Sequence, residues 1–343
     1  MTEHQGDSGS LVSPMWQSIY RQKLVDLGVF HKDPEIAGIY SPVYEPAEIA
    51  RFMSEHYANR ENVRKQAECL HLTDYYKHLL MEAFERLRFP SRSQASPLVL
   101  ELGAGFGSAT FPLLSLLPGA TVIASEFSVA MLAVLKEKLE REPRSVQSRC
   151  GLLQLNAENL DFEENSCDLV VGAALLHHLF RPEQVMAGCH KILKPGGHAL
   201  FFEPFESGMS IVNIIYKMFL DNPRSSRLPK HVRDYMAYSS AYWDGMTHFP
   251  KDHVFFQGAD DKWLFTRRFL EAEAAKVGFT TCVTYGISKS ERPFEEMVKS
   301  HFKGNAMPEP EAWMLEIVDR FENNFSKSMK LDLFTEGVLV LTK

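Results

Sequence analysis

The fold of this chain is decided by one stretch of ten residues, Val99-Leu100-Glu101-Leu102-Gly103-Ala104-Gly105-Phe106-Gly107-Ser108. The short aliphatic run before the first glycine predicts a buried parallel strand. The three glycines on alternate positions permit a sharp turn and let a ligand approach without meeting a Cβ atom. Residues 110–117 then predict a helix that stops at a Pro-Gly pair. This order is typical of a nucleotide-type ligand site, although a purely structural turn explains the glycines about as well.

The glycine spacing departs from two common phosphate-binding patterns. The dinucleotide fingerprint G-x-G-x-x-G needs a glycine where this chain has Ser108. The P-loop pattern needs a lysine directly after its last glycine, and none follows here. The turn is therefore assigned neither to a dinucleotide nor to a nucleoside triphosphate.

The segments that follow alternate between strand-like and helix-like patterns. Glu126 ends the second strand-like run, where an acid can accept hydrogen bonds from both hydroxyls of a ribose. Ser128 predicts an N-cap for the next helix. The alternation predicts an α/β fold with a doubly wound parallel sheet. The predicted strands cover residues 99–102, 121–124, 151–155, 168–173 and 198–203, with helices over 110–117, 129–139 and 182–193.

Several motifs occur in the order and spacing of one known family. Besides the E-x-G-x-G-x-G turn and Glu126, they are Asn156-Ala157-Glu158-Asn159-Leu160, Leu176-His177-His178-Leu179 and Leu193-Lys194-Pro195-Gly196-Gly197. Together they resemble the class I S-adenosylmethionine (SAM)-dependent methyltransferases, in particular the small-molecule group called type 11. The resemblance covers about residues 97–286 and the last predicted strand, 336–341. Each motif alone is modest, and it is their order that makes the pattern specific.

The resemblance implies a Rossmann-like sheet of seven strands, the last one antiparallel and inserted near the edge, with SAM as cofactor. The family usually has an aspartate where this chain has Asn156, and that aspartate accepts a hydrogen bond from the adenine amino group. Asparagine keeps an acceptor oxygen for this bond but lacks the negative charge. The cofactor-binding residues that the resemblance implies are Glu101, Gly103, Ala104, Gly105, Gly107, Glu126, Phe127, Asn156, Ala157 and Ala173.

Two adjacent histidines, His177 and His178, are the candidate catalytic residues because they follow the fourth predicted strand. Histidine has the right ordinary pKa to act as a general base on an acceptor that bears a proton. Holding the loop is the alternative role, and a carboxylate acceptor would need no base. Adjacent residues rarely point the same way, so no metal site is expected.

The rest of the chain suggests additions to one globular core. The 343 residues, 45% of them hydrophobic, exceed a minimal methyltransferase core. We expect a disordered tail over residues 1–10, a helical N-terminal cap over 11–96 and a methyltransferase domain over 97–343, with helical insertions at about 205–261 and 288–333. The cap prediction includes helices over 14–27, ended by Gly28 as a C-cap, and over 46–57 and 61–87.

Composition and net charge limit the classes of partner that this protein is expected to bind. A net charge of −7 with no basic cluster argues against nucleic acid, and no apolar run is long enough to span a membrane. The first ten residues lack the pattern of a signal peptide. Five widely spaced cysteines fit reduced thiols, so we expect a cytoplasmic protein.

The leading functional hypothesis is methyl transfer from SAM to a small, largely apolar molecule, aromatic or acyl, with O-methylation favoured. The helix over 211–220 is apolar on most faces and needs cover from the sheet, the N-terminal helices, a second subunit in a homodimer, or the substrate. The insertion after the fifth strand is placed to cover a substrate, although its aromatic residues could instead form a satellite core. The alternatives are a SAM-fold protein with non-methylating chemistry such as cyclisation, and a non-catalytic partner subunit.

Overall fold

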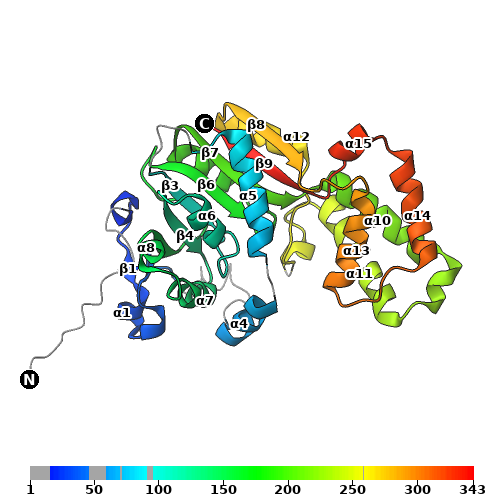
Figure 1. Ribbon diagram of the computed structural model, residues 1–343, viewed down its shortest axis with the longest axis horizontal. Helices are drawn as coiled ribbons and strands as arrows, with labels where there is room; N and C mark the ends of the chain where they lie inside the picture. Colours follow the sequence, from blue (N-terminus) through cyan, green and yellow to red (C-terminus); the bar gives the residue numbers. More distant parts are fainter. Residues whose placement is uncertain (1–15, 46–58, 70–71, 91–95, 258) are drawn as a thin grey trace, which may run out of the picture. The chain divides into compact units, whose positions relative to one another are not determined.

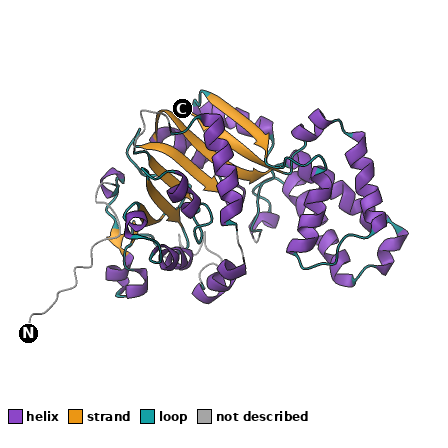
Figure 2. Ribbon diagram, viewed as in Figure 1, coloured by secondary structure: helices purple, strands orange, loops and turns teal. Residues whose placement is uncertain are grey.

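The computed structural model describes residues 16–45, 59–69, 72–90, 96–257 and 259–343. The tail predicted for residues 1–10 and the helix predicted over 46–57 lie outside them. The helices, shown in Figures 1 and 2, are α1 (Leu27–His31), α4 (Arg60–Cys69), α5 (Thr73–Leu87), α6 (Thr110–Leu116), α7 (Val129–Leu139), α8 (Arg144–Gln147), α9 (Pro182–Ile192), α10 (Glu206–Asp221), α11 (Lys230–His248), α12 (Arg267–Val277), α13 (Pro293–Gly304), α14 (Ala312–Asn324) and α15 (Lys327–Asp332). The strands are β1 (Val25–Asp26), β2 (Ile39–Ser41), β3 (Leu98–Leu102), β4 (Thr121–Glu126), β5 (Cys150–Gln154), β6 (Cys167–Ala173), β7 (Leu193–Pro204), β8 (Thr281–Gly286) and β9 (Glu336–Thr342).

The strands of the described residues form one sheet in the order β1-β2-β5-β4-β3-β6-β7-β9-β8. Strand β3 runs parallel to both β4 and β6, and β5 runs parallel to β4. The chain moves outward from β3 to β5 and then returns to β6 on the other side of β3. The strand order therefore reverses between β3 and β6, which is where ligands bind in open α/β sheets.

The sheet has nine strands, so the prediction of seven was wrong in number. The six strands predicted with residue ranges are all present as β3 to β7 and β9, and β9 lies between β7 and β8. The two additional strands come from the N-terminal segment that was predicted to be helical. Strand β2 pairs parallel with β5, and β1 pairs antiparallel with β2.

The helix predicted over residues 14–27 is also wrong where the structure describes it. Trp16 packs on the backbone of Gly151 in β5, where a Cβ atom would lie 2.8 Å from the indole. Tyr20 meets Phe162 edge to face at 4.9 Å. Each of these two aromatic side chains packs against a different partner. Tertiary packing therefore overrides the helical pattern of this segment. Gly28 lies inside α1, where it permits close approach to Ala37.

Two compact units make up the chain. One contains residues 1–173, 183–200 and 342–343, and the other contains residues 174–182 and 201–341. The glycine turn after β3 and the end of β4 belong to the first unit, whereas both candidate histidines belong to the second. The division into an N-terminal cap and a domain with two insertions remains a proposal.

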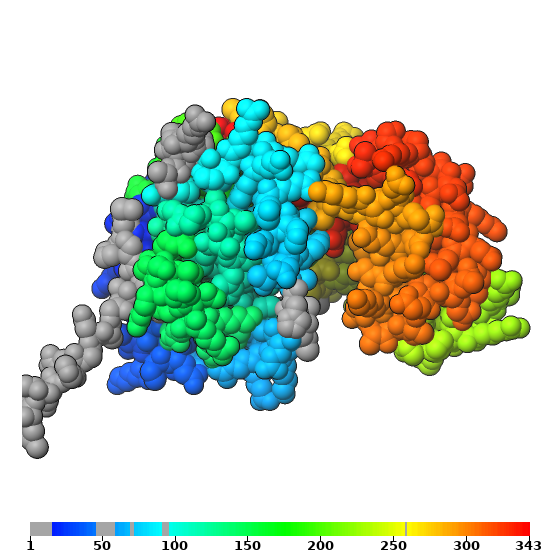
Figure 3. Space-filling view, viewed as in Figure 1, coloured from blue at the N-terminus to red at the C-terminus, as the bar shows by residue number. Residues whose placement is uncertain are grey.

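Helices α10, α11, α13 and α14 of the second unit pack together around a core of their own. Val212, Ile215, Tyr216 and Phe219 of α10 lie in this core, whose other members come from later segments of the chain. In the space-filling view of Figure 3, helices α13 and α14 (orange to red) lie side by side. The apolar helix expected to need a sheet, a subunit or a substrate is thus covered largely by other inserted helices. Among the described residues, no helix combines the length and apolarity needed to cross a membrane.

Candidate functional site

The turn after β3 contains three glycines, all with positive φ. The φ angles are +68° at Gly103, +54° at Gly105 and +98° at Gly107, a region that L side chains rarely adopt. A Cβ atom on Gly105 would meet nothing closer than the Met131 sulfur at 4.0 Å. A Cβ atom on Gly107 would instead lie 2.6 Å from Leu135. Gly105 therefore borders open space, while Gly107 lets the turn pack closely against α7.

Glu126 connects this turn to the start of α7. One carboxylate oxygen accepts a hydrogen bond from the backbone N–H of Gly105 at 3.1 Å. The other accepts from the N–H of Ser128 at 2.9 Å. The backbone N–H of Ala104 donates to the carbonyl of Ser125 at 2.9 Å, which fixes the turn against the end of β4. The structure thus places the predicted acid directly beside the predicted glycine turn.

Glu101 is the penultimate residue of β3, and its side chain is buried, at 1% exposure. The hydroxyl of Thr110 donates to its carboxyl group at 2.6 Å and so joins the strand to the first residue of α6. Burial raises the pKa of Glu101 to about 8; the hydrogen bond from Thr110 opposes that rise, and the charge of Glu126 adds to it. What the structure shows for Glu101 is an anchor beneath the turn, and its predicted contact with the cofactor stays a prediction.

Asn156 follows β5 and meets an aromatic residue that the sequence did not single out. Its backbone N–H donates to the hydroxyl of Tyr44 at 2.9 Å, and its side-chain oxygen accepts from the N–H of Glu158 at 3.0 Å. The ring of Tyr44 lies edge to face with that of Phe127, with centroids 5.4 Å apart. Ala157, next along the chain, is buried. Tyr44 follows β2, which the sequence did not predict, so no pattern connected it with this corner of the sheet.

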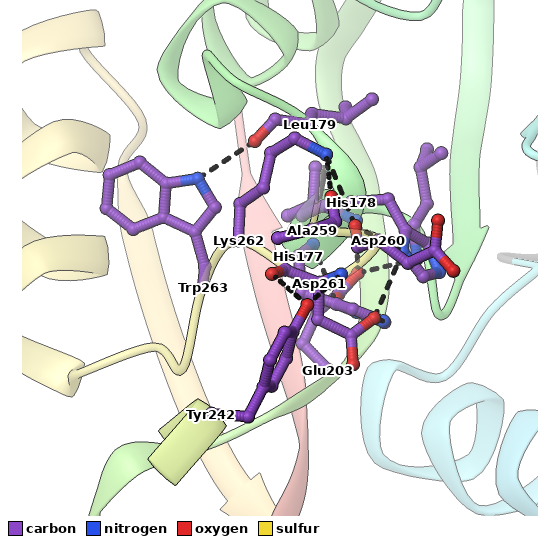
Figure 4. Close-up of polar contacts among 12 residues, drawn as sticks. His177, His178, Leu179, Glu203, Tyr242, Ala259, Asp260, Asp261, Lys262 and Trp263 are labelled. Carbon is purple, nitrogen blue, oxygen red and sulfur yellow. Dashed lines mark hydrogen bonds and ion pairs between the residues drawn. The ribbon is translucent and has the colours of Figure 1, made fainter. Parts of the chain in front are cut away.

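The histidine loop begins where β6 ends, at Ala173. A buried carboxylate, that of Glu203, organises the loop (Figure 4). It accepts hydrogen bonds from the backbone N–H groups of Leu175 (3.1 Å), Leu176 (2.7 Å) and His177 (3.2 Å). It also lies 2.6 Å from Nδ1 of the His177 ring. An ionised carboxylate can only accept, so the network assigns the proton of neutral His177 to Nδ1 and leaves the Nε2 lone pair available.

Nε2 of His177 faces the carboxylate of Asp261, with Oδ1 at 3.5 Å. The same oxygen lies 3.2 Å from Nδ1 of His178, which is also 3.1 Å from the carbonyl of Asp260. Burial tends to lower the pKa of His178, but the hydrogen bond and the charge of Asp261 outweigh it and raise that pKa. Burial likewise tends to raise the pKa of Asp261, and the two histidines outweigh it and lower that pKa.

Asp261 lies beside the two histidines because residues 259–263 are hydrogen-bonded to the loop that carries them (Figure 4). The backbone N–H of Lys262 donates to the carbonyl of His177 at 2.6 Å, and the indole N–H of Trp263 donates to that of Leu179 at 2.9 Å. The hydroxyl of Tyr242 donates to the carbonyl of Asp261 at 2.9 Å. His178 and Asp260 stand 82 positions apart in the chain, so no local motif could have predicted this contact.

The two histidine rings lie with centroids 4.0 Å apart, and both residues belong to the 3-10 turn Leu176–His178. The expectation that adjacent histidines point apart was therefore wrong here. An apolar cluster flanks the polar groups and shares Tyr242 with them. Its members are Met209, Met246, Phe256 and Leu264, with Phe180, Tyr242, Trp243, Phe255 and Ala259 packed against them.

Comparisons with known proteins agree with this fold. Residues 100–199 match the family described as "Methyltransferase domain". A mitochondrial 2-methoxy-6-polyprenyl-1,4-benzoquinol methylase of Caenorhabditis elegans is 32% identical over 123 residues, which cover 36% of this chain and 43% of that protein. A malonyl-[acyl-carrier protein] O-methyltransferase of Marinomonas sp. is 28% identical over 164 residues, which cover 48% of this chain and 56% of that protein. The chain thus spans about half the length of these curated relatives.

Among solved structures, a chain of the complex between the Haloferax volcanii Trm112 methyltransferase activator and a methyltransferase aligns with a TM-score of 0.50 and 15% identity. The alignment covers 84% of this chain and 98% of that one. At this identity the likeness concerns the fold alone.

Proposed function

Since the chain belongs to the class I SAM-dependent methyltransferases, we propose that it transfers a methyl group from SAM to a small, largely apolar acceptor. SAM, when bound, supplies a methyl group that its sulfonium centre already makes electrophilic. The protein then has to bind SAM, orient the acceptor, exclude water and manage any proton on the nucleophile. Described residues are available for each of these tasks.

The residues around the glycine turn fit SAM. The open space beside Gly105 would admit the cofactor, and Glu126 would accept hydrogen bonds from its ribose hydroxyls. Tyr44, Phe127 and Asn156 lie together after β2, β4 and β5, and we assign the adenine to them. Strands β3 and β6 are parallel neighbours in the sheet.

We propose His177 as the general base, with O-methylation as the reaction. The observation that carries this proposal is the buried Glu203, which lies 2.6 Å from Nδ1 and leaves Nε2 to accept a proton from an acceptor hydroxyl. Asp261 faces the same nitrogen and stabilises the imidazolium that forms. His178 shares the Asp261 carboxylate, and we assign it to orienting the acceptor.

We expect Glu126→Ala to weaken SAM binding by about ten- to a hundredfold, since hydrogen bonds to a charged group are worth about 1.5–3 kcal/mol. Titration calorimetry with SAM measures the effect. Glu140→Ala, which removes a half-exposed carboxylate on the far end of α7, is the matched control and should bind like the wild type. NADH should not bind, and tight NADH binding would reverse the assignment of the cofactor.

We expect acceptors with an extended apolar or aromatic body and a single hydroxyl to be methylated best, because the cluster of Met209, Met246, Phe256 and Leu264 lies beside the histidine loop. The name of one relative points the same way, since it contains a polyprenyl benzoquinol. The test is a panel that pairs apolar acceptors with sugars and short amino acids of similar nucleophilicity. A clear preference for the polar set would show that this cluster is only core.

The partners and location follow the same proposal. We place the protein in the cytoplasm, with a small molecule rather than nucleic acid as its partner. Cys150, Cys167, Cys189 and Cys282 form no disulfide with one another. A homodimer remains a further proposal that sedimentation can test.

A further inference from the structure

We propose that Nε2 of His177, Nδ1 of His178 and Oδ1 of Asp261 bind a divalent first-row transition-metal cation. The three groups converge: the carboxylate oxygen lies 3.5 Å from the first nitrogen and 3.2 Å from the second. Each of the three residues offers one ligand atom, and these atoms lie within 4.8 Å of one another. This inference goes beyond the proposed methyl transfer and concerns only residues of the second unit.

The separations are those of ligand atoms that share one ion. With metal–nitrogen and metal–oxygen distances of about 2.0–2.2 Å, neighbouring ligands of a tetrahedral site lie about 3.3–3.6 Å apart. The two observed nitrogen–oxygen separations are within 0.3 Å of each other and close to this range. The carboxylate oxygen therefore already lies at about a ligand-to-ligand distance from both nitrogens.

Glu203 supplies an independent observation that points to a metal. Its carboxylate lies 2.6 Å from Nδ1 of His177 and is itself fixed by three backbone N–H groups. A carboxylate behind a histidine fixes the tautomer and directs the opposite nitrogen at a metal. In the proposed site, that opposite nitrogen is the one that faces Asp261.

The loop that carries Asp261 is held in place before any ion arrives. Tyr242 bonds both the carbonyl and the N–H of Asp261, and the N–H of Lys262 bonds the carbonyl of His177. The ammonium of Lys262 is the competing cation nearby, but it donates to the carbonyls of Ala259 and Asp260. The metal would replace the proton that His178 shares with Asp261.

The donor set selects the kind of ion. Two imidazoles and one carboxylate suit Zn²⁺, Fe²⁺ or Co²⁺, whereas Mg²⁺ and Ca²⁺ prefer all-oxygen sites. Three protein ligands also leave at least one position open. Because the ion would occupy the Nε2 lone pair of His177, binding should stop that nitrogen from acting as a base.

The test uses the full chain stripped with a chelator and titrated with ZnCl₂ by calorimetry, with CoCl₂ in a parallel experiment followed by visible absorption. We expect one ion per chain, and Asp261→Ala and His178→Ala should each weaken binding by at least about tenfold, since even a supporting carboxylate is worth about 10–100-fold. His78→Ala, which removes a histidine of α5, is the matched control and should bind like the wild type. MgCl₂ should not compete.

Absence of binding, or equal affinity in all three variants, would overturn the site. Circular dichroism identifies variants that fail to fold, and Asp261→Asn, which keeps the shape of the side chain, then replaces Asp261→Ala. Turnover distinguishes this inference from the proposed function. Binding with inhibition supports both, whereas binding with activation supports the metal site and overturns the role of His177 as a base.

Discussion

Replacing Gly105 by valine is expected to weaken SAM binding by about a hundredfold or more. The residue has φ +54°, and a Cβ atom there would meet no protein atom closer than 4.0 Å. Protein packing therefore does not require glycine at this position. The added side chain would fill the space that the cofactor is proposed to occupy, and the left-handed backbone would add about 1–2 kcal/mol of strain.

Gly196→Val separates these two causes. Gly196 also has a positive φ, +77°, and nothing lies within 4 Å of a Cβ atom built on it. It stands in β7, away from the glycine turn, so the substitution carries similar strain without blocking the proposed site. We expect calorimetry to show normal SAM affinity for Gly196→Val. Unchanged affinity in Gly105→Val would disprove the placement of SAM at this turn.

The second large effect is expected from Glu203→Gln, which should lower kcat by about a hundredfold or more while SAM affinity stays nearly intact. The amide can donate a hydrogen bond to Nδ1 of His177, which would move the ring proton to Nε2 and remove the base. In serine proteases, the loss of the carboxylate that orients the histidine costs about 10⁴-fold in kcat for the same reason. Initial-rate kinetics at saturating SAM measure the effect.

Asp168→Asn is the matched control for that substitution. Asp168 is another buried carboxylate, which accepts from the N–H of Leu98 and from the ammonium of Lys194 and is not part of the histidine loop. Its amide variant should lose some stability and keep its kcat. His177→Ala should lose as much activity as Glu203→Gln, and the double variant should lose little more. Full activity in Glu203→Gln would assign Glu203 to folding alone.

The parts of the fold that sequence could predict are those with local causes. Strands β3 to β7 follow from short apolar runs, because strands buried on both faces must be apolar along their whole length. Glu126 was predicted to end the second strand, and the parallel pairing of β3 and β4 brings that strand end to the edge where the glycine turn lies. Strands β1 and β2 are two and three residues long, too short to show any period. The spacing of Trp16, Ile19, Leu24 and Leu27 resembled that of a helix.

Only part of the candidate site could be predicted, because only some of its residues lie in local sequence motifs. Gly105, Glu126 and the two histidines lie in recognisable motifs. Tyr44 and Asp261 carry no such signal, since each comes from a segment distant in the sequence. The hydroxyl of Tyr44 accepts a hydrogen bond from the backbone N–H of Asn156. Asp261 lies in the segment 259–263, which is hydrogen-bonded to the histidine loop. The two histidine rings lie close together where both face Asp261, a residue from a distant segment, which the sequence did not predict.

The measurement that tests the central claim most directly is product analysis with methyl-labelled SAM. The purified full chain is incubated with labelled SAM and the small-molecule fraction of a cell extract, and the products are identified by mass spectrometry. We predict S-adenosylhomocysteine together with a labelled apolar molecule that carries a new O-methyl group, and neither should form with Gly105→Val. A chain that binds SAM but forms no S-adenosylhomocysteine with any fraction would contradict the claim and favour non-methylating chemistry or a non-catalytic partner subunit.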